Sequence, residues 1–202
     1  MARVLGIVLA GGRGRRLAAG VPKALVVLGG RTLLARARAT LAALCDEVLV
    51  CAPGSLALPV EESQRVRDPE PGEGPLAGLV AALAARPFER AVVLGVDLVF
   101  VTQATLSGVA SLWADEPAIV PAPGGRPQPL AAWYAPEALA PLAAALAAGA
   151  RALVPAVLAL PPRLAHDAEL AAQPGGVEAF FNLNTPEDFA LAGRRLAREG
   201  AR

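Results

Sequence analysis

The sequence contains few of several residue types that often carry function. It has two cysteines and one histidine, and only one of its 19 basic residues is a lysine. Cys45 and Cys51 have no cluster of further ligand residues around them, so neither a disulfide framework nor a zinc site is predicted. The single histidine, His166, lies in a polar stretch and is given no functional role. These absences leave arginine, carboxylate and amide side chains as the candidates for chemistry.

Charge of one sign and long hydrophobic runs are also lacking. A net charge of +1 argues against a general nucleic-acid-binding protein, which usually has a strong basic excess. No run reaches the ~18 uncharged apolar residues of a membrane span. The apolar run at residues 4–10 comes before the basic residues, whereas the apolar run of a secretory signal comes after them. We therefore expect a cytoplasmic monomer with no membrane contact, folded as one domain over residues 1–202.

Short apolar runs alternate with segments of helical periodicity along the chain. Strands are expected at residues 4–9, 47–51, 64–67, 90–95, 118–121, 130–134, 163–165 and 179–181. Helices are expected at residues 32–44, 75–85, 102–113, 136–147, 151–158 and 186–198. This alternation predicts a three-layer α/β/α fold with a mainly parallel, Rossmann-like sheet. Ligands bind such sheets beyond the carboxyl ends of the strands.

A glycine-rich loop follows the first expected strand. Three glycines between residues 11 and 14 allow a tight turn, and successive N–H groups there can bind an anion. Arg13 and Arg16 add forked donors suited to phosphate, and Lys23 follows within reach. Neither the dinucleotide fingerprint nor the P-loop pattern is matched, because Leu17 and Pro22 stand where these need glycine. A nucleotide-phosphate site is therefore predicted, with a solvated basic turn as the alternative.

Several polar residues follow other expected strands. Asp97 comes just after the strand at residues 90–95, where a carboxylate can hold Mg²⁺ together with substrate phosphates, unless it only forms a turn. Asp68 leads through glycines into a helix N-terminus, which is typical of a binding loop but also of an ordinary cap. Asn182 and Asn184 are the only asparagines. On an extended segment both would point to one face, ahead of a helix capped by Thr185.

Taken together, these segments resemble the molybdenum cofactor guanylyltransferase family within the nucleotidyltransferase superfamily. The matching segments are Leu9-Ala10-Gly11-Gly12 through Arg16, Pro22-Lys23-Ala24-Leu25, Asp68 with Gly74-Pro75-Leu76-Ala77-Gly78, Asp97, Gln128-Pro129-Leu130 and Asn182-Leu183-Asn184-Thr185-Pro186. The resemblance implies the fold of nucleotide-diphospho-sugar transferases. It also implies transfer of GMP from Mg·GTP to the terminal phosphate of the molybdenum-bound pterin, with release of pyrophosphate.

The resemblance assigns roles residue by residue. It places the nucleotide against Leu9, Ala10, Gly11, Gly12, Arg13, Lys23, Cys51, Asp68, Gly74 and Asp97. Lys23, Arg16 and Asp97 would be catalytic, and Asp97 would ligate Mg²⁺. Gln128 would face the acceptor, and Asn182 and Asn184 would face the acceptor or the reacting phosphates. Cofactor-delivery proteins or molybdoenzymes are the protein partners that it suggests.

Two alternatives stay open at this stage. The family usually has aspartate before the lysine, whereas this sequence has Pro22, and many cytidylyl relatives also have proline there. A CTP-dependent or other nucleotidyltransferase is therefore the nearest rival. Leu98 and Val99 replace the family's usual Met-Pro after the metal-site aspartate. That departure keeps a non-catalytic nucleotide-binding adaptor as the second rival.

Overall fold

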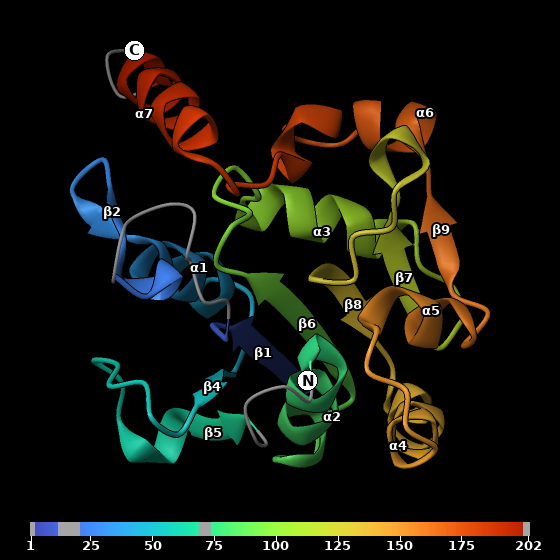
Figure 1. The fold of residues 1–202 in the computed structure, drawn as a ribbon. Coiled ribbons are helices and arrows are strands. Elements are labelled where there is room, and N and C mark those ends of the chain that lie inside the picture. Colours follow the sequence, from blue (N-terminus) through green and yellow to red (C-terminus); the bar gives the residue numbers. More distant parts are fainter. Residues whose placement is uncertain (1–2, 12–20, 69–73, 200–202) are drawn as a thin grey trace.

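A seven-stranded sheet forms the centre of the computed structural model, which describes residues 3–11, 21–68 and 74–199 (Figure 1). Its strand order is β5-β4-β1-β6-β8-β7-β9. The strands are β1 (Val4–Leu9), β4 (Glu47–Pro53), β5 (Arg65–Asp68), β6 (Arg90–Gly95), β7 (Ala118–Pro121), β8 (Ala131–Tyr134) and β9 (Arg163–Ala165). Only β8 runs antiparallel to its neighbours in this sheet. The predicted, mainly parallel α/β sheet is confirmed.

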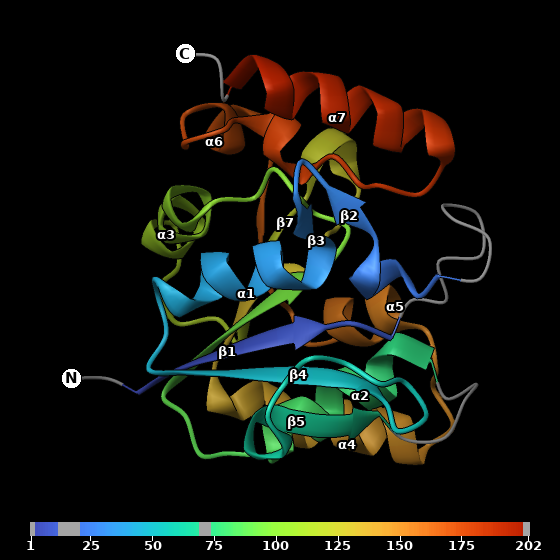
Figure 2. The same cartoon turned by 90° about the vertical axis from the view of Figure 1, so that its left-hand side faces the viewer.

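Helices cover both faces of the sheet, as Figure 2 shows. On one face lie α1 (Leu33–Ala42), α3 (Gln103–Ser111) and α7 (Pro186–Glu199). On the other lie α2 (Gly74–Ala84), α4 (Leu139–Ala147) and α5 (Leu153–Leu158). In β1 the side chains alternate between the two cores, with Ile7 in one and Val8 in the other. This alternation explains why a fully apolar strand can be buried between two helical layers.

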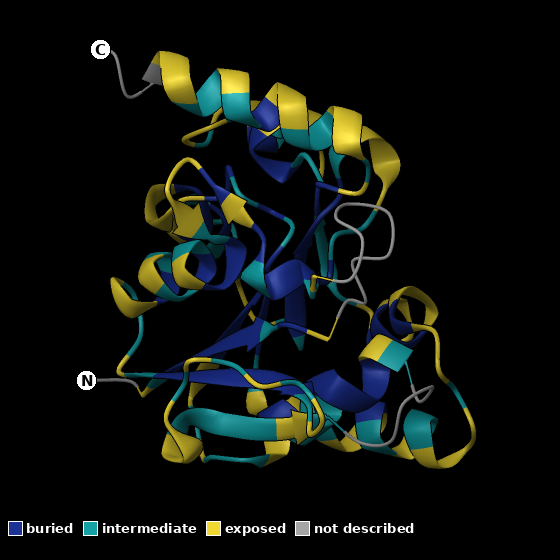
Figure 3. Ribbon diagram, turned by 60° about the vertical axis from the view of Figure 1, so that its left-hand side comes forward, coloured by how far each residue is buried: buried dark blue, intermediate teal, exposed yellow. Residues whose placement is uncertain are grey.

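The helix ends follow local rules that the sequence displays. Thr32 caps α1 by accepting a hydrogen bond at Oγ1 from the Ala35 N–H at 3.1 Å, as predicted. Thr102 and Thr105 form a reciprocal capping box at α3. In Figure 3 the sheet is largely buried, whereas α7 exposes much of its outer face. Nowhere in the described part of the chain is a helix long and apolar enough to cross a membrane.

The structure departs from the sequence prediction in several elements. The expected strand at residues 179–181 is wrong: a 3-10 helix, η5 (Val177–Phe180), occupies this segment and buries Phe180. A short apolar run does not by itself distinguish strand from buried helix. The hairpin of β2 (Val27–Leu28) and β3 (Arg31–Thr32) and the helix α6 (Asp167–Ala171) were not predicted. The Gly29-Gly30 pair, with φ of +55° and +77°, is the signal that could have revealed the hairpin.

The sheet brings distant parts of the sequence to one edge. The parallel strands β1, β4, β5 and β6 end together, with Leu9 beside Cys51 and Gly95, and Pro53 beside Asp68. Because β8 runs the other way, its beginning lies at this same edge, next to the end of β6. Gly11, Asp68, Asp97 and the Gln128 segment therefore lie near one edge of the sheet.

Candidate functional site

A buried lysine is the centre of the site. Lys23 opens η1 (Lys23–Leu25), directly after Pro22, and its side chain is only 9% exposed. Its Nζ donates hydrogen bonds to Asp97 Oδ2 at 3.0 Å and to Asn184 Oδ1 at 3.1 Å. A buried ammonium needs such partners, because an unpaired charge in the interior costs several kcal/mol, about 3–5 when one partner of a buried pair is removed. Three residues that are far apart in sequence thus form one polar cluster.

Asp97 is held in a tight turn after β6. Its Oδ1 packs against Gly95, where an added Cβ would lie 2.7 Å from that oxygen. The Gly95 N–H donates to the Leu130 carbonyl at 2.7 Å, and the Gly95 carbonyl accepts from the Leu98 N–H at 3.3 Å. The absence of a side chain at residue 95 therefore gives the carboxylate its room, while Lys23 fixes its other oxygen.

The geometry suits a metal that takes few protein ligands. Across the described residues there is no group of three or more His, Cys, Asp or Glu side chains that could hold an ion. Asp97 offers one carboxylate, which remains 21% exposed. Mg²⁺ is commonly bound by one or two carboxylates, with phosphates and water filling the other positions. Asp97 fits this pattern. The described residues do not form a site in which the protein alone surrounds the ion.

The segment before α7 is tied to this centre at three places. The Leu183 N–H donates to the Asp97 carbonyl at 3.0 Å, and the Leu183 side chain is fully buried. In the residue before Leu183, Asn182 Nδ2 donates to Gln128 Oε1 at 3.3 Å. In the residue after it, Asn184 Oδ1 accepts from Lys23 Nζ. Both asparagines thus turn toward predicted site residues, although they meet different partners.

The cap of α7 holds the same segment. Asp188 Oδ2 accepts from the N–H groups of Asn184 and Thr185 at 2.9 and 2.8 Å, and the Asp188 N–H donates to Thr185 Oγ1 at 3.1 Å. The hydrogen bonds from these backbone groups, that of Asn184 first, lower the pKa of the Asp188 carboxyl. The predicted cap at Thr185 is confirmed, and its partner Asp188 also fixes Asn184.

Asp68 forms a second corner of the site. It is the last residue of β5, and its carboxylate lies between Gly11, just after β1, and Gly78 in α2. A Cβ added at Gly11 would lie 2.9 Å from Oδ2, and one at Gly78 would lie 3.2 Å from Oδ1. No residue in the described ranges hydrogen-bonds to this carboxylate, and burial raises its pKa. The group is an acceptor without a protein donor among those residues.

The structure corrects the position of Cys51. The expected strand ends at residue 51, but β4 continues to Pro53, so Cys51 lies inside the strand and not at its open end. Its side chain is 1% exposed, and its Sγ donates to the Gly78 carbonyl at 3.3 Å. Burial raises the pKa of this thiol to about 12, so it stays protonated. Its role is to pack α2 against the sheet, and its side chain does not reach the open site.

The remaining nucleotide residues fall into two groups. Ala10 is buried and donates its N–H to the Cys51 carbonyl at 2.8 Å. It lies between half-buried Leu9 and exposed Gly11. Gly74 has φ of +79°, and a Cβ there would lie 2.7 Å from the Arg151 carbonyl oxygen, so the start of α2 requires glycine. The predicted residues Gly12, Arg13 and Arg16 lie outside the described residues.

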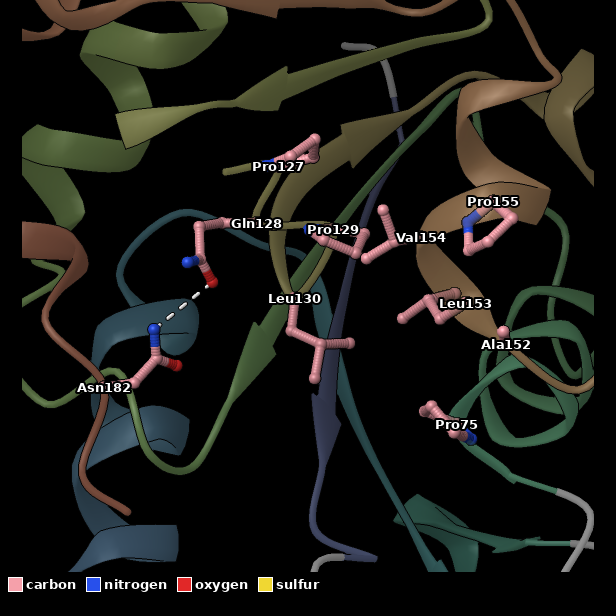
Figure 4. A pocket seen from close by; sticks show the side chains of 10 residues that line it. All are labelled: Pro75, Pro127, Gln128, Pro129, Leu130, Ala152, Leu153, Val154, Pro155 and Asn182. Atoms are coloured by element: carbon pink, nitrogen blue, oxygen red, sulfur yellow. Dashed lines mark hydrogen bonds between the residues drawn. The ribbon is translucent and has the colours of Figure 1, made fainter. Parts of the chain in front are cut away.

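A cavity of about 350 Å³ adjoins the asparagine segment (Figure 4). Gln128 and Asn182 face each other on one side of it, and the start of α5 forms the opposite side. The lining residues are Pro75, Pro127, Gln128, Pro129, Leu130, Ala152, Leu153, Val154, Pro155 and Asn182. Sequence reasoning identified Gln128 and Asn182 but missed the α5 wall, which carries no polar signal.

Together, the glycine loop after the first strand and the lysine–aspartate pair at the carboxyl edge of the sheet define a nucleotidyltransferase with a Rossmann-like fold. The model of the MobA-like NTP transferase domain matches residues 6–163. The chain belongs to this family.

Similar proteins agree with this assignment. A protein of Chloroflexus aggregans named "Probable molybdenum cofactor guanylyltransferase" is 37% identical, over 92% of this chain and 91% of its own length. The molybdenum cofactor guanylyltransferase of Cereibacter sphaeroides is 35% identical, over 98% and 99%.

Solved structures show the same architecture. The molybdopterin-guanine dinucleotide biosynthesis protein A of Archaeoglobus fulgidus superposes with a TM-score of 0.77 at 26% identity, over 96% of this chain and 99% of that one. The 2-C-methyl-D-erythritol 4-phosphate cytidylyltransferase of Thermus thermophilus reaches 0.70 at 25% identity, over 98% of both chains. The fold is thus shared by enzymes that use different nucleotides.

Proposed function

We propose that this protein transfers GMP from GTP to the terminal phosphate of the molybdenum cofactor and releases pyrophosphate. The observation that carries the proposal is the buried Lys23 ammonium, held by Asp97 and Asn184 at the edge where the glycine loop ends. A fixed positive charge at this place suits a reaction between two anions. The names of the relatives supply the identity of the two substrates.

The chemistry needs alignment more than proton transfer. The attacking group is a phosphate monoester, which is largely dianionic near pH 7 and needs no general base. Its oxygen forms a bond to the α-phosphorus while the bond from that phosphorus to the β-phosphate oxygen breaks, and pyrophosphate leaves. Lys23 and the loop arginines Arg13 and Arg16 would bind the phosphates and hold them in line.

Asp97 is the residue that would hold Mg²⁺. When bound, the ion neutralises phosphate charge and so assists the approach of a second anion. The Lys23 contact leaves one carboxylate oxygen of Asp97 without an ionic partner among the described residues. This arrangement supports metal binding by Asp97 together with the nucleotide.

The two substrates would approach from different sides. On the nucleotide side, Leu9, Ala10, Gly11, Gly12 and Gly74 would lie along the guanosine triphosphate, and the Asp68 carboxylate would accept N–H groups of guanine. On the acceptor side, the pterin would enter the cavity of Figure 4. Its ring faces would contact proline and aliphatic side chains, and its polar edge would meet Gln128 and Asn182.

A nucleotide panel tests the proposal. Binding of GTP, CTP, ATP and UTP would be measured by calorimetry with Mg²⁺, followed by pyrophosphate release in the presence of molybdenum cofactor. We expect a preference for GTP and release of pyrophosphate only with the acceptor. A preference for CTP would replace the guanylyl proposal by a cytidylyl one, and nucleotide binding without pyrophosphate release would favour an adaptor.

A further inference from the structure

We propose that Asn184 is a positioning residue for Lys23 and not a ligand of the acceptor. Its side-chain oxygen accepts a hydrogen bond from Lys23 Nζ at 3.1 Å, on the ammonium group that also binds Asp97. Only the oxygen of the amide can take this bond, because ammonium groups and amide nitrogens both donate. The inference rests on the proposed function only in that Lys23 binds a nucleotide.

A lysine ammonium needs more than one acceptor to be fixed. It is a compact charge at the end of a flexible four-carbon chain, with three N–H donors. Asp97 Oδ2 and Asn184 Oδ1 take two of these donors, and the side chain is only 9% exposed. The two acceptors define the direction of the third donor, which we assign to a nucleotide phosphate.

The neutrality of Asn184 matters for the same reason. Asp97 already balances the charge of Lys23. A second carboxylate at residue 184 would hold the ammonium in place but would add a negative charge beside the phosphates. An amide oxygen fixes the ammonium without adding that repulsion.

The backbone of Asn184 is itself held. Its N–H donates to Asp188 Oδ2 at 2.9 Å, within the cap of α7. The preceding residue, Leu183, is fully buried and donates its N–H to the Asp97 carbonyl at 3.0 Å. The backbone is therefore held at Asn184 and at the residue before it, although Asn184 as a whole is exposed.

Asn182 provides an internal contrast. It carries the same side chain two residues earlier, but it donates to Gln128 and lines the cavity. No Lys23 contact involves Asn182 within the described part of the chain, so the acceptor role remains with Asn182 and Gln128. The segment also lies beyond residue 163, where the match to the family model ends. One of the two acceptors that fix Lys23 thus comes from a part of the chain outside that match, and the other, Asp97, comes from inside it.

A double-mutant cycle tests the inference without the acceptor. Binding of Mg·GTP would be measured by calorimetry for wild type, Asn184→Leu, Lys23→Met and the double variant. We expect Asn184→Leu to raise Kd about tenfold and Lys23→Met about a hundredfold, while the double variant matches Lys23→Met within about twofold. Effects through a shared partner are non-additive. An additive loss of about a thousandfold would overturn the proposal, as would an unchanged Kd in Asn184→Leu.

Two further variants act as controls. Asn182→Leu removes the same amide at the neighbouring position and should leave the Kd for Mg·GTP unchanged. Asn184→Asp keeps an oxygen acceptor for Lys23, so its melting temperature should equal that of wild type. Its added negative charge should still make Mg·GTP binding weaker than in wild type. If Asn184→Leu melts well below wild type, the same cycle read by urea unfolding of the free protein should show coupling between residues 23 and 184. Absence of that coupling would also overturn the proposal.

Failure of this inference can be told apart from failure of the proposed function. A protein that prefers CTP would contradict GMP transfer, yet the same cycle run with Mg·CTP would still show whether Asn184 acts through Lys23. Conversely, normal GMP transfer with an additive cycle would contradict only the role of Asn184.

Discussion

Two aspartates stand at the same edge of the sheet, and their surroundings differ. Asp97 is bound by the Lys23 ammonium at 3.0 Å, and its backbone carbonyl accepts the Leu183 N–H. Asp68 receives no hydrogen bond from the described residues, and burial raises its pKa. Each carboxylate lies close to a glycine, Gly95 and Gly11 respectively. Among the described residues, therefore, only Asp97 has a protein partner for its carboxylate.

The difference indicates a division of labour. A carboxylate already paired with a fixed cation is preorganised, and such groups act on charge that develops during a reaction. A half-buried carboxylate without a donor among the described residues can accept N–H groups from a ligand, and hydrogen bonds to charged groups contribute about 1.5–3 kcal/mol. We therefore assign turnover to the Asp97 corner and nucleobase choice to the Asp68 corner.

The largest effect is expected from breaking the Asp97 corner. Lys23→Ala and Asp97→Ala should each lower turnover at least ~100-fold, the scale expected for the loss of a preorganised charge. Pyrophosphate release under saturating Mg·GTP and acceptor measures this loss. A near-normal rate in either variant would refute the catalytic role of that residue.

The thermal stability of the same variants provides the control. Asp97→Ala leaves the buried Lys23 ammonium without its ionic partner, whereas Lys23→Ala leaves a carboxylate that is 21% exposed. Leaving a buried charge unpaired costs more than leaving an exposed one. Asp97→Ala should therefore lower the melting temperature more than Lys23→Ala does. The reverse order would show that the two groups are not buried as described.

A pair of glycine substitutions separates the two corners. Gly95→Ala places a Cβ 2.7 Å from Asp97 Oδ1, and Gly11→Ala places one 2.9 Å from Asp68 Oδ2. Since Lys23 restrains Asp97, its carboxylate cannot move aside freely, and misplacement of ~1 Å can cost up to about a hundredfold in rate. Gly95→Ala should lower kcat at least ~10-fold, whereas Gly11→Ala should mainly raise the KM for GTP. Steady-state kinetics with both substrates varied would reveal this split, and equal effects on kcat would contradict it.

Asp68→Asn should change nucleotide choice more than rate. The substitution removes a charged acceptor, and hydrogen bonds to charged groups contribute about 1.5–3 kcal/mol. The affinity for GTP should therefore fall about tenfold or more, with a smaller loss for the other nucleotides and a kcat within about threefold of wild type. Calorimetry with GTP and CTP measures the change in preference. An unchanged ratio of the two affinities would remove Asp68 from the guanosine site.

The sequence predicts the edge of the sheet where the site lies, but not all of its contacts. The residue types and the alternation of strands with helices suffice to predict that Lys23 and Asp97 lie in one region. The burial of the Cys51 side chain is not predicted, because β4 runs two residues further than the pattern indicates and the residue lies inside the strand. The contact of Asn184 with Lys23 joins residues that are 161 positions apart, and no local pattern encodes such a pairing. The α5 wall of the cavity was missed because apolar residues there resemble any core segment.

The smallest expected effect is on how the free energy of unfolding depends on pH. It tests the contrast between a carboxylate with protein donors and one without them among the described residues. Burial raises the pKa of Asp68 in the folded protein. The charged form of Asp68 therefore destabilises the fold above that raised pKa, and the penalty disappears as pH falls toward the ordinary carboxyl value. Asp68→Asn should thus raise the free energy of unfolding near pH 7, and this gain should shrink as pH approaches 4.

Asp188 supplies the matched control of opposite sign. Backbone hydrogen bonds from Asn184 and Thr185 lower its pKa, so its charged form stabilises the fold above the ordinary carboxyl value. That stabilisation is lost as pH falls through the lowered pKa. Asp188→Asn should therefore lower the free energy of unfolding near pH 7, and the deficit should shrink in acid. Urea unfolding of wild type and both variants at several pH values measures the two trends. If they run in the same direction, the two carboxyl groups do not differ in their pairing as the structure describes.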